Sequence, residues 1–343
     1  MRAMRATAHT NIALVKYWGK RPDGGRDLNL PAVGSLSMTL DEYRTVTVVR
    51  PRAAADAFVL DGATLTGAAA DRVAKHLDRV WRTRGAEPGP RPSCEVDSVN
   101  HVPTAAGLAS SASGFAALTL AAAAALSEDM VEGMAEGDGA DRRLLSALAR
   151  RGSGSAARSL WGGFVRLDRG EESDGSDCVA RPVATRHHWD LKMLIVHTTT
   201  GAKAVGSTGG MELCKNTSPY YGAWVESSQR DLDTATSRLQ NRDLRGLGEV
   251  MEHSCFKMHA SMWAARPPLI YWNGVTVEVM REVQRARADG LQGWATSDAG
   301  PHVKVLCEAA TADALVARLE SVVGVVNVKA LGVGPDPKVE AAT

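Results

Sequence analysis

Residues 11–21 place the strongest constraint on the fold of this chain, because a predicted buried strand is followed directly by several charged residues. Positions 12–15 are all apolar and predict a strand that lies in the core. Lys16, Lys20 and Arg21 follow within six positions, together with two aromatic residues. Cations at the end of a buried strand are costly unless an anion shares the site. The segment therefore predicts an anion-binding site, and other loops of the chain indicate that the anion is phosphate.

The composition limits the class of protein. A chain of 343 residues, with 44% hydrophobic and 23% charged residues, is typical of a soluble globular protein of about two domains. Its net charge of +1 provides no broad basic surface, so we expect neither a nucleic-acid nor a membrane partner, and phosphate binding must be local. Five scattered cysteines without a CxxC pair, and an N-terminus without an apolar signal core, favour a cytoplasmic protein.

Strand-like and helix-like segments are mixed in both halves of the chain. In the first half, strands are predicted at 12–15, 35–40, 45–49, 95–102 and 163–167, and helices at 71–84, 108–126 and 142–151. The segments 35–40 and 45–49 are expected to pair with each other, and 127–141 to form an exposed acidic loop. In the second half, strands are predicted at 191–197, 291–297, 303–308 and 325–332, and helices at 218–240, 242–264, 274–289 and 311–321. This order predicts two α+β domains, 1–185 and 186–343, that share a cleft.

Two loops rich in glycine and serine have the composition of anion sites. Residues 103–114 open a helix, so backbone N–H groups and the helix dipole could hold a phosphate, and the serines could reach a magnesium ion. The loop lacks the GK[ST] of a Walker A motif, and a packed Ala/Ser helix with a serine N-cap fits equally well. Ser153, Ser155 and Arg158 could converge on one anion. Taken alone, that segment fits better as a capped helix whose arginine faces solvent.

A lone acid and a polar loop complete the candidates. Asp298 lies between two apolar strands and precedes a Gly-Pro turn. It could cap the turn or point into the cleft as a catalytic group, and its spacing does not decide between the two. Residues 198–211 form a hydroxyl-rich loop that contains Lys203; such a loop suits a lid over phosphates but also a plain connector.

Together these segments resemble the mevalonate diphosphate decarboxylases of the galactokinase–homoserine kinase–mevalonate kinase (GHMP) superfamily. The matching runs follow the family's order along nearly the whole chain: 11–21 with 28–31, 103–114, 152–163, 207–211, 217–221 and 298–307. The most specific are the KYWGK run at 16–20 and the DAGP run at 298–301. The resemblance implies an N-terminal domain like ribosomal protein S5 domain 2 and a ferredoxin-like C-terminal domain. It places the active site between the two domains and implies that the protein is a homodimer.

The resemblance also implies a reaction. The family uses ATP and Mg²⁺ to convert (R)-5-diphosphomevalonate into isopentenyl diphosphate. The 3-hydroxyl is phosphorylated, and phosphate and CO₂ then leave together. A related mevalonate 3-kinase or a phosphomevalonate decarboxylase is the alternative.

Roles for individual residues follow from the same resemblance. Asp298 would orient the 3-hydroxyl and accept or share its proton. Lys16 would neutralise charge on the transferred phosphate, and Arg158 would position the substrate carboxylate. The substrate diphosphate would be held by Tyr17, Lys20, Ser153, Ser155, Arg158 and Ser207. The phosphates of ATP would be held by Gly107, Leu108, Ala109, Ser110, Ser111 and Lys203. Ser111 would also contact Mg²⁺.

Overall fold

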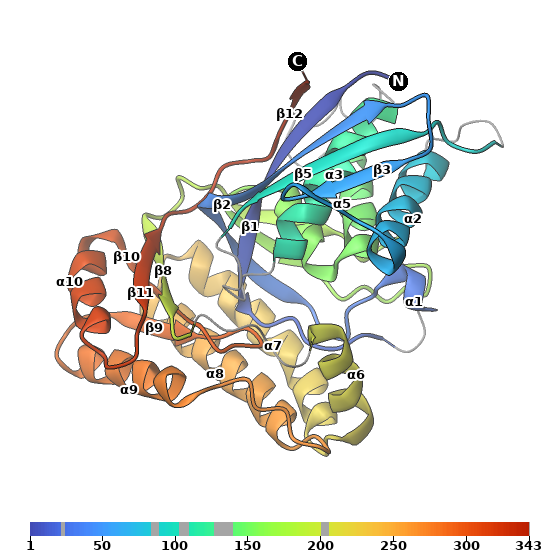
Figure 1. Ribbon diagram of the computed structural model, residues 1–343. Coiled ribbons are helices and arrows are strands. Elements are labelled where there is room, and N and C mark those ends of the chain that lie inside the picture. The colour runs from blue at the N-terminus through green and yellow to red at the C-terminus, as the bar shows by residue number, and fades with distance from the viewer. Residues whose placement is uncertain (22–24, 84–88, 103–109, 127–139, 200–205, 343) are drawn as a thin grey trace.

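The computed structural model describes residues 1–21, 25–83, 89–102, 110–126, 140–199 and 206–342. They form two α+β units, each built on its own sheet (Figure 1). The N-terminal unit lies above the C-terminal one in this view, and the two chain ends lie close together at its top. This architecture confirms the predicted fold class.

The N-terminal unit is built on an eight-stranded sheet. Its strands are β1 (Met4–Val15), β2 (Ser35–Pro51), β3 (Ala57–Leu60), β4 (Ala63–Thr64), β5 (Cys94–His101), β6 (Phe164–Leu167), β7 (Ala180–Ala184) and β12 (Lys338–Ala341). The main path is β12-β1-β2-β5-β3-β4, with β6 paired to β2 and β7 paired to β6. The prediction that 35–40 and 45–49 pair with each other was wrong, because both belong to β2 and pair with β1 across a register shift between His9 and Asn11.

Helices cover one face of this sheet. They are α1 (Gly25–Leu28), α2 (Gly67–Thr83), α3 (Ser110–Leu126), α5 (Ala140–Gly152) and the 3₁₀ helix η2 (Gly154–Leu160). The centre of this layer is α3, which packs on β1 and β2 and is buried from Ala116 to Leu126. Its alanines let the helix approach the strands closely, which explains why it is apolar all round rather than amphipathic. Most of the predicted acidic loop at 127–141 lies outside the described residues.

The C-terminal unit has the strand order of a ferredoxin-like domain. Its strands are β8 (Leu191–His197), β9 (Gly293–Thr296), β10 (Val303–Glu308) and β11 (Asn327–Leu331). Their order is β11-β8-β10-β9, and every neighbouring pair is antiparallel. The third strand thus lies between the first and second, the split βαβ arrangement. The helices are α6 (Ser207–Thr217), α7 (Tyr221–Gln240), α8 (Leu244–Trp263), α9 (Gly274–Ala288) and α10 (Ala309–Glu320).

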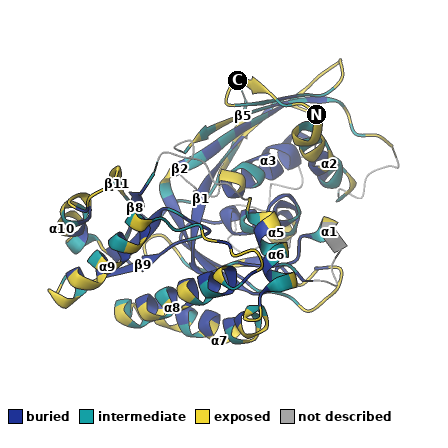
Figure 2. Cartoon of the chain, turned by 60° about the horizontal axis from the view of Figure 1, so that its bottom comes forward, coloured by how far each residue is buried: buried dark blue, intermediate teal, exposed yellow. Residues whose placement is uncertain are grey.

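A shared apolar core joins the two units. Ile12 and Leu14 of β1 and Leu36 of β2 pack in one cluster with Met193 of β8 and Leu306 of β10. Figure 2 shows β1 and β2 largely buried where they cross between the units, whereas α7 to α10 expose their outer faces. This packing brings the end of β1 next to the loop that follows β9. In addition, β12 pairs with β1, so the end of the chain returns to the first sheet.

None of the helices in the described residues is both long enough and apolar enough to span a bilayer.

A buried histidine makes the N-terminal unit sensitive to acid. His76 of α2 is fully buried, and its Nε2 lies 2.8 Å from Thr119 Oγ1 of α3. Burial lowers the pKa of His76 from 6.5 to about 3, so the unfolded chain binds a proton below pH 6.5 that the folded chain does not. We expect His76 to remove about 2 kcal/mol of the free energy of unfolding between pH 7 and pH 5. Urea unfolding at both pH values should show a smaller loss in His76→Gln, and an equal loss would contradict this.

Candidate active site

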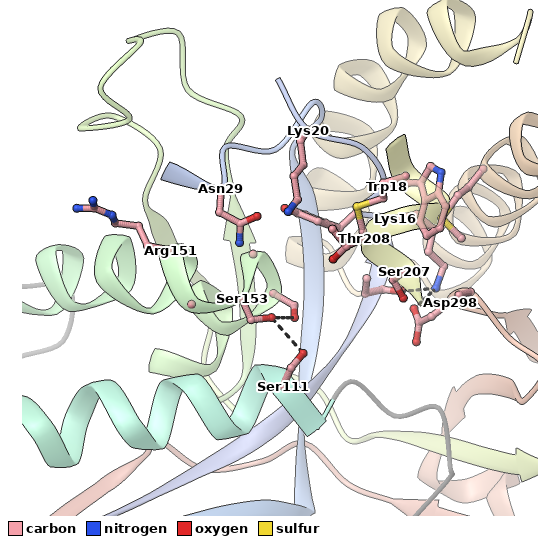
Figure 3. A pocket seen from close by; sticks show the side chains of 18 of the residues that line it. Lys16, Trp18, Lys20, Asn29, Ser111, Arg151, Ser153, Ser207, Thr208 and Asp298 are labelled. Atoms are coloured by element: carbon pink, nitrogen blue, oxygen red, sulfur yellow. Dashed lines mark hydrogen bonds and ion pairs between the residues drawn. The ribbon is translucent and has the colours of Figure 1, made fainter. Parts of the chain in front are cut away.

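A polar cleft of about 550 Å³ lies where the two units meet (Figure 3). Five cations and one carboxylate are among its described lining residues, although the chain as a whole has a net charge of only +1. The lining residues used below are Lys16, Tyr17, Lys20, Arg72, Arg79, Ser111, Arg151, Ser153, Ser155, Ser207, Thr208 and Asp298. The cleft is therefore a local anion-binding site, as the sequence predicted.

The carboxylate of Asp298 lies between two lysines. Lys16 Nζ is 2.9 Å from Oδ1, and Lys304 Nζ is 3.2 Å from Oδ2. Both lysine side chains are only 1% exposed, whereas Asp298 is 26% exposed and opens toward the cleft. Burial by itself would raise the pKa of Asp298, but Lys16 and Lys304 outweigh it and hold that pKa well below its usual range. Asp298 is thus ionised across the physiological pH range.

Hydrogen bonds to residues of α8 and to His302 hold the loop that carries Asp298. His259 of α8 lies with its Nε2 2.8 Å from the backbone oxygen of Asp298. The neighbouring Ser297 donates its backbone N–H to Cys255 Sγ at 3.2 Å and its hydroxyl to the oxygen of His302 at 3.0 Å. Burial lowers the pKa of His259 to about 3, so its ring is neutral and serves as a hydrogen-bond partner. The carboxylate is therefore presented by a well-held turn.

Arg158 lies in η2, almost fully buried beside the same site. It donates from Nε and Nη2 to Asn11 Oδ1 at 3.2 and 3.0 Å, and from Nη1 to Ser35 Oγ at 2.7 Å. Burial lowers the pKa of Arg158 to about 10, with the charge of Asp298 acting against this shift, so the guanidinium stays charged. These contacts use three of its five N–H groups and fix its plane, and the other two N–H groups have no hydrogen-bond partner among the described residues.

Hydroxyl groups and a helix start form the floor of the cleft. Ser153 Oγ is 3.1 Å from Ser111 Oγ, at the beginning of α3, and 3.3 Å from Ser155 Oγ. The hydroxyl of Tyr17 is buried and has no hydrogen-bond partner among the described residues. It lies directly against Gly154, where any side chain would collide with it. A phosphate oxygen would satisfy this hydroxyl.

The helix α6 also points its N-terminus at the cleft. Ser207 and Thr208 line the cleft, and the N-cap residue Gly206 supplies no side-chain cap. The prediction that 198–211 is entirely a loop was wrong, because α6 begins at Ser207. Uncapped N–H groups and the helix dipole add positive character at this edge.

Further cations extend the cleft away from Asp298. Lys20, Arg72 and Arg79 line it together with Arg151, which lies at the opposite end from Asp298 in Figure 3. Arg72 donates to the oxygen of Gly152 at 2.6 Å. Burial lowers the pKa of both Lys20 and Arg72, and the charge of Arg72 adds to the effect on Lys20. Cations held this close together favour an anion between them.

The structure thus brings most of the predicted residues together. Lys16, Tyr17, Lys20, Ser111, Ser153, Ser155, Ser207 and Asp298 line one cleft. Arg158 lies next to it, and Ser110 begins α3. Gly107, Leu108, Ala109 and Lys203 lie outside the described residues.

Four charged residues were missed: Lys304, Arg72, Arg79 and Arg151. Lys304 is a lysine within the apolar strand 303–308, and that mismatch was the available signal. Arg72 and Arg79 are seven residues apart and therefore share a face of α2, but such a pair usually faces solvent.

The family models agree with this geometry. Residues 8–180 match the diphosphomevalonate decarboxylase-like N-terminal domain, and residues 193–334 match the mevalonate 5-diphosphate decarboxylase C-terminal domain. The human diphosphomevalonate decarboxylase is 36% identical over 324 residues, which cover 88% of this chain and 76% of the human protein. The chain belongs to the diphosphomevalonate decarboxylase family.

Solved structures of this family share the fold. The mevalonate diphosphate decarboxylase of Staphylococcus aureus is 35% identical with a TM-score of 0.88, covering 99% of this chain and 98% of that one. The Enterococcus faecalis family member is 34% identical with a TM-score of 0.85, covering 99% of both chains. A protein called MDDEF, solved in complex with MVAPP, AMPPCP and magnesium, is 35% identical with a TM-score of 0.85 and covers 99% of both chains. The predicted resemblance to this family is therefore confirmed.

Proposed function

We propose that this chain catalyses the ATP-dependent decarboxylation of (R)-5-diphosphomevalonate to isopentenyl diphosphate, with release of ADP, phosphate and CO₂. The observation that carries the proposal is the contact between Lys16 and Asp298 at one end of a cationic cleft. The complex of the related MDDEF with MVAPP, AMPPCP and magnesium supports the same pair of substrates.

The reacting end of the cleft is the pair Lys16 and Asp298. Bound ATP supplies the phosphoryl group that turns the 3-hydroxyl into a good leaving group. Asp298 accepts a hydrogen bond from that hydroxyl, orients it and shares its proton as the oxygen takes up the phosphoryl group. A carboxylate with so low a pKa is a weak base, so its main contribution is orientation and stabilisation of positive charge at C3. Lys16 neutralises negative charge on the transferred and departing phosphate.

Arg158 is assigned to the substrate carboxylate. A tight bidentate contact would stabilise the ground state and oppose the loss of CO₂. Its contacts to Asn11 and Ser35 leave two N–H groups for an orienting contact that weakens as CO₂ forms.

The nucleotide phosphates and magnesium fit the start of α3. Ser111 is exposed there beside Ser153, and Ser110 precedes it in the first turn. The described residues contain no group of three or more His, Cys, Asp or Glu that could hold a metal ion. Mg²⁺ commonly keeps several waters and is bound in part through substrate phosphates, and the Ser111 hydroxyl is the protein contact that we assign to it. Gly107, Leu108, Ala109 and Lys203 remain assigned to ATP by resemblance alone.

The substrate diphosphate is assigned to Tyr17, Lys20, Ser153, Ser155 and Ser207, extended by Arg72. We expect Lys20→Met to raise the KM for 5-diphosphomevalonate about tenfold with little change in kcat, because it removes a contact made in both ground and transition states. The KM for 5-phosphomevalonate should rise less. Arg245→Ala, which removes a cation that is 81% exposed, is the matched control. Equal effects on both substrates would contradict the assignment.

One assay tests the proposed function. The purified protein is incubated with ATP, Mg²⁺ and 5-diphosphomevalonate, and ADP and trapped CO₂ are measured. We expect equal amounts of both. ADP with a stable 3-phosphorylated acid and no CO₂ would instead identify a 3-kinase, and faster turnover of 5-phosphomevalonate would identify a phosphomevalonate decarboxylase.

We also propose the domain boundary, the oligomeric state and the cellular location of this protein. The domain boundary is placed near 185 and 186, with an N-terminal ATP-binding domain and a C-terminal domain whose last strand returns to β1. A homodimer in the cytoplasm is expected, and light scattering of the purified protein tests the dimer.

A further inference from the structure

Lys304 lies at a position of β10 where the strand pattern predicts an apolar side chain. On β10, Val303, Val305 and Cys307 pack on one side, in the core formed with α9 and α10, whereas Leu306 packs in the core shared by the two units. Lys304 alternates with the first set and therefore lies on the side of Leu306. Placing an amine there, only 1% exposed, costs desolvation that an apolar residue would avoid. Such a conflict between pattern and residue is typical of a functional position.

The contacts of Lys304 differ from those of Lys16. Lys304 Nζ lies 3.2 Å from Asp298 Oδ2 and 3.5 Å from the backbone oxygen of His302. Lys16 Nζ lies 2.9 Å from Asp298 Oδ1 and 2.9 Å from the oxygen of Ala13. Lys16 lines the cleft, but Lys304 is not among the described lining residues. One carboxylate therefore has one lysine on the cleft side and one behind it.

A single lysine could not serve both the carboxylate and the substrate. Phosphate groups entering the cleft would attract Lys16, and Asp298 would then face those anions without its partner. Nearby negative charge favours the protonated form of a carboxyl group, and an unpaired buried carboxylate is costly. The neighbouring His259 and Cys255 cannot replace the cation, since burial lowers the pKa of His259 to about 3 and raises the pKa of the Cys255 thiol.

We propose that Lys304 is the fixed counter-ion of Asp298, which keeps the carboxylate ionised and in place when phosphate draws Lys16 away. The inference rests on the proposed function and assigns Lys304 as a positioning residue that acts through Asp298. The backbone of Lys304 is held on both sides, because β10 is an inner strand. Lys304 pairs there with Ile195 of β8 and with Thr296 of β9. Lys16 instead follows directly after the end of β1, outside the strand ladder, and its backbone N–H donates to Ser254 Oγ at 3.0 Å.

A double-mutant cycle tests this role. Lys304→Met keeps a side chain of similar length and leaves Asp298 paired with Lys16, so the fold should survive. We expect kcat for 5-diphosphomevalonate to fall about 10- to 100-fold, the contribution of one charge-assisted hydrogen bond. The KM values for both substrates should change less than about threefold. In an Asp298→Asn background, Lys304→Met should change kcat by less than about threefold, because the residue it serves is already lost.

Two further variants make the outcome decisive. Lys304→Gln keeps a hydrogen-bond donor without the charge and should lose activity like Lys304→Met. It can replace Lys304→Met in the cycle if the methionine variant is unstable. Lys257→Met breaks another largely buried ion pair, 2.6 Å from Asp231, and should leave the Asp298 cycle unchanged.

The results separate this inference from the proposed function. Equal losses from Lys304→Met in both backgrounds would show a purely structural role or an independent catalytic one, and unchanged kcat in the wild-type background would show no role; either overturns the inference. Absence of CO₂ from the wild-type protein would instead overturn the proposed function.

Discussion

Replacing Asp298 by asparagine is expected to lower kcat at least about 10³-fold while the affinity for ATP stays within about threefold. The amide keeps the size of the side chain but cannot balance Lys16 and Lys304, which lie within 2.9 and 3.2 Å of the carboxylate. It also no longer offers the negative charge that orients the 3-hydroxyl and stabilises positive charge at C3. The assigned nucleotide contacts at the start of α3 are not altered. Steady-state turnover and equilibrium binding of nucleotide measure the two effects.

The control for this variant must also break a buried ion pair. Asp231→Asn does so, because Asp231 is 6% exposed and 2.6 Å from Lys257, and neither residue lines the cleft. It should lower stability without a comparable loss of kcat. A large loss of ATP affinity in Asp298→Asn, with an intact fold by thermal melting, would mean that Asp298 has another role.

Replacing Lys16 by methionine is expected to lower kcat by about 10²- to 10³-fold. Asp298 keeps Lys304 as its partner, so the variant leaves a neutral pair and not an unpaired carboxylate. Lys16→Met removes the positive charge that faces the cleft and can interact with phosphate. Because that charge develops its full effect in the transition state, the KM for 5-diphosphomevalonate should change much less than kcat.

Single-turnover measurements check this prediction directly. Phosphorylation of the 3-hydroxyl and release of CO₂ should both slow in Lys16→Met. A variant with normal kcat and a raised KM would show that Lys16 contributes only to binding of the ground state.

Much of the fold could be predicted because its signals are local. The apolar runs of β8 and β10, the helical spacing in α7 and α8, and the break at Pro267 and Pro268 before α9 are recognised within a few residues. The strand order β11-β8-β10-β9 then follows from the order of elements in a ferredoxin-like domain. The errors arose where neighbouring residues gave a misleading signal. The polar stretch around Glu42 suggests a turn, but β2 continues through it because β1 adjusts with a register shift.

The candidate site was predicted in part. Lys16 and Asp298 were chosen from the motifs around them, and the structure places them in contact across 282 positions of the chain. Lys304, Arg72, Arg79 and Arg151 were missed, because each lies in a segment with an ordinary explanation as a strand or the polar face of a helix. Only the packing of α2 beside α5 turns that face toward the cleft.

Short-range periodicity, turn residues and glycine positions are properties of neighbouring residues, so the order of residues alone fixed the element types, the two α+β units and the anion-binding ends of strands and helices. The partner of each charge is a property of the folded chain, because the shared core sets which distant segments meet and which side chains lose contact with water. That core placed two buried lysines on one aspartate, and their charges, which outweigh the effect of burial, gave Asp298 its low pKa and its proposed role.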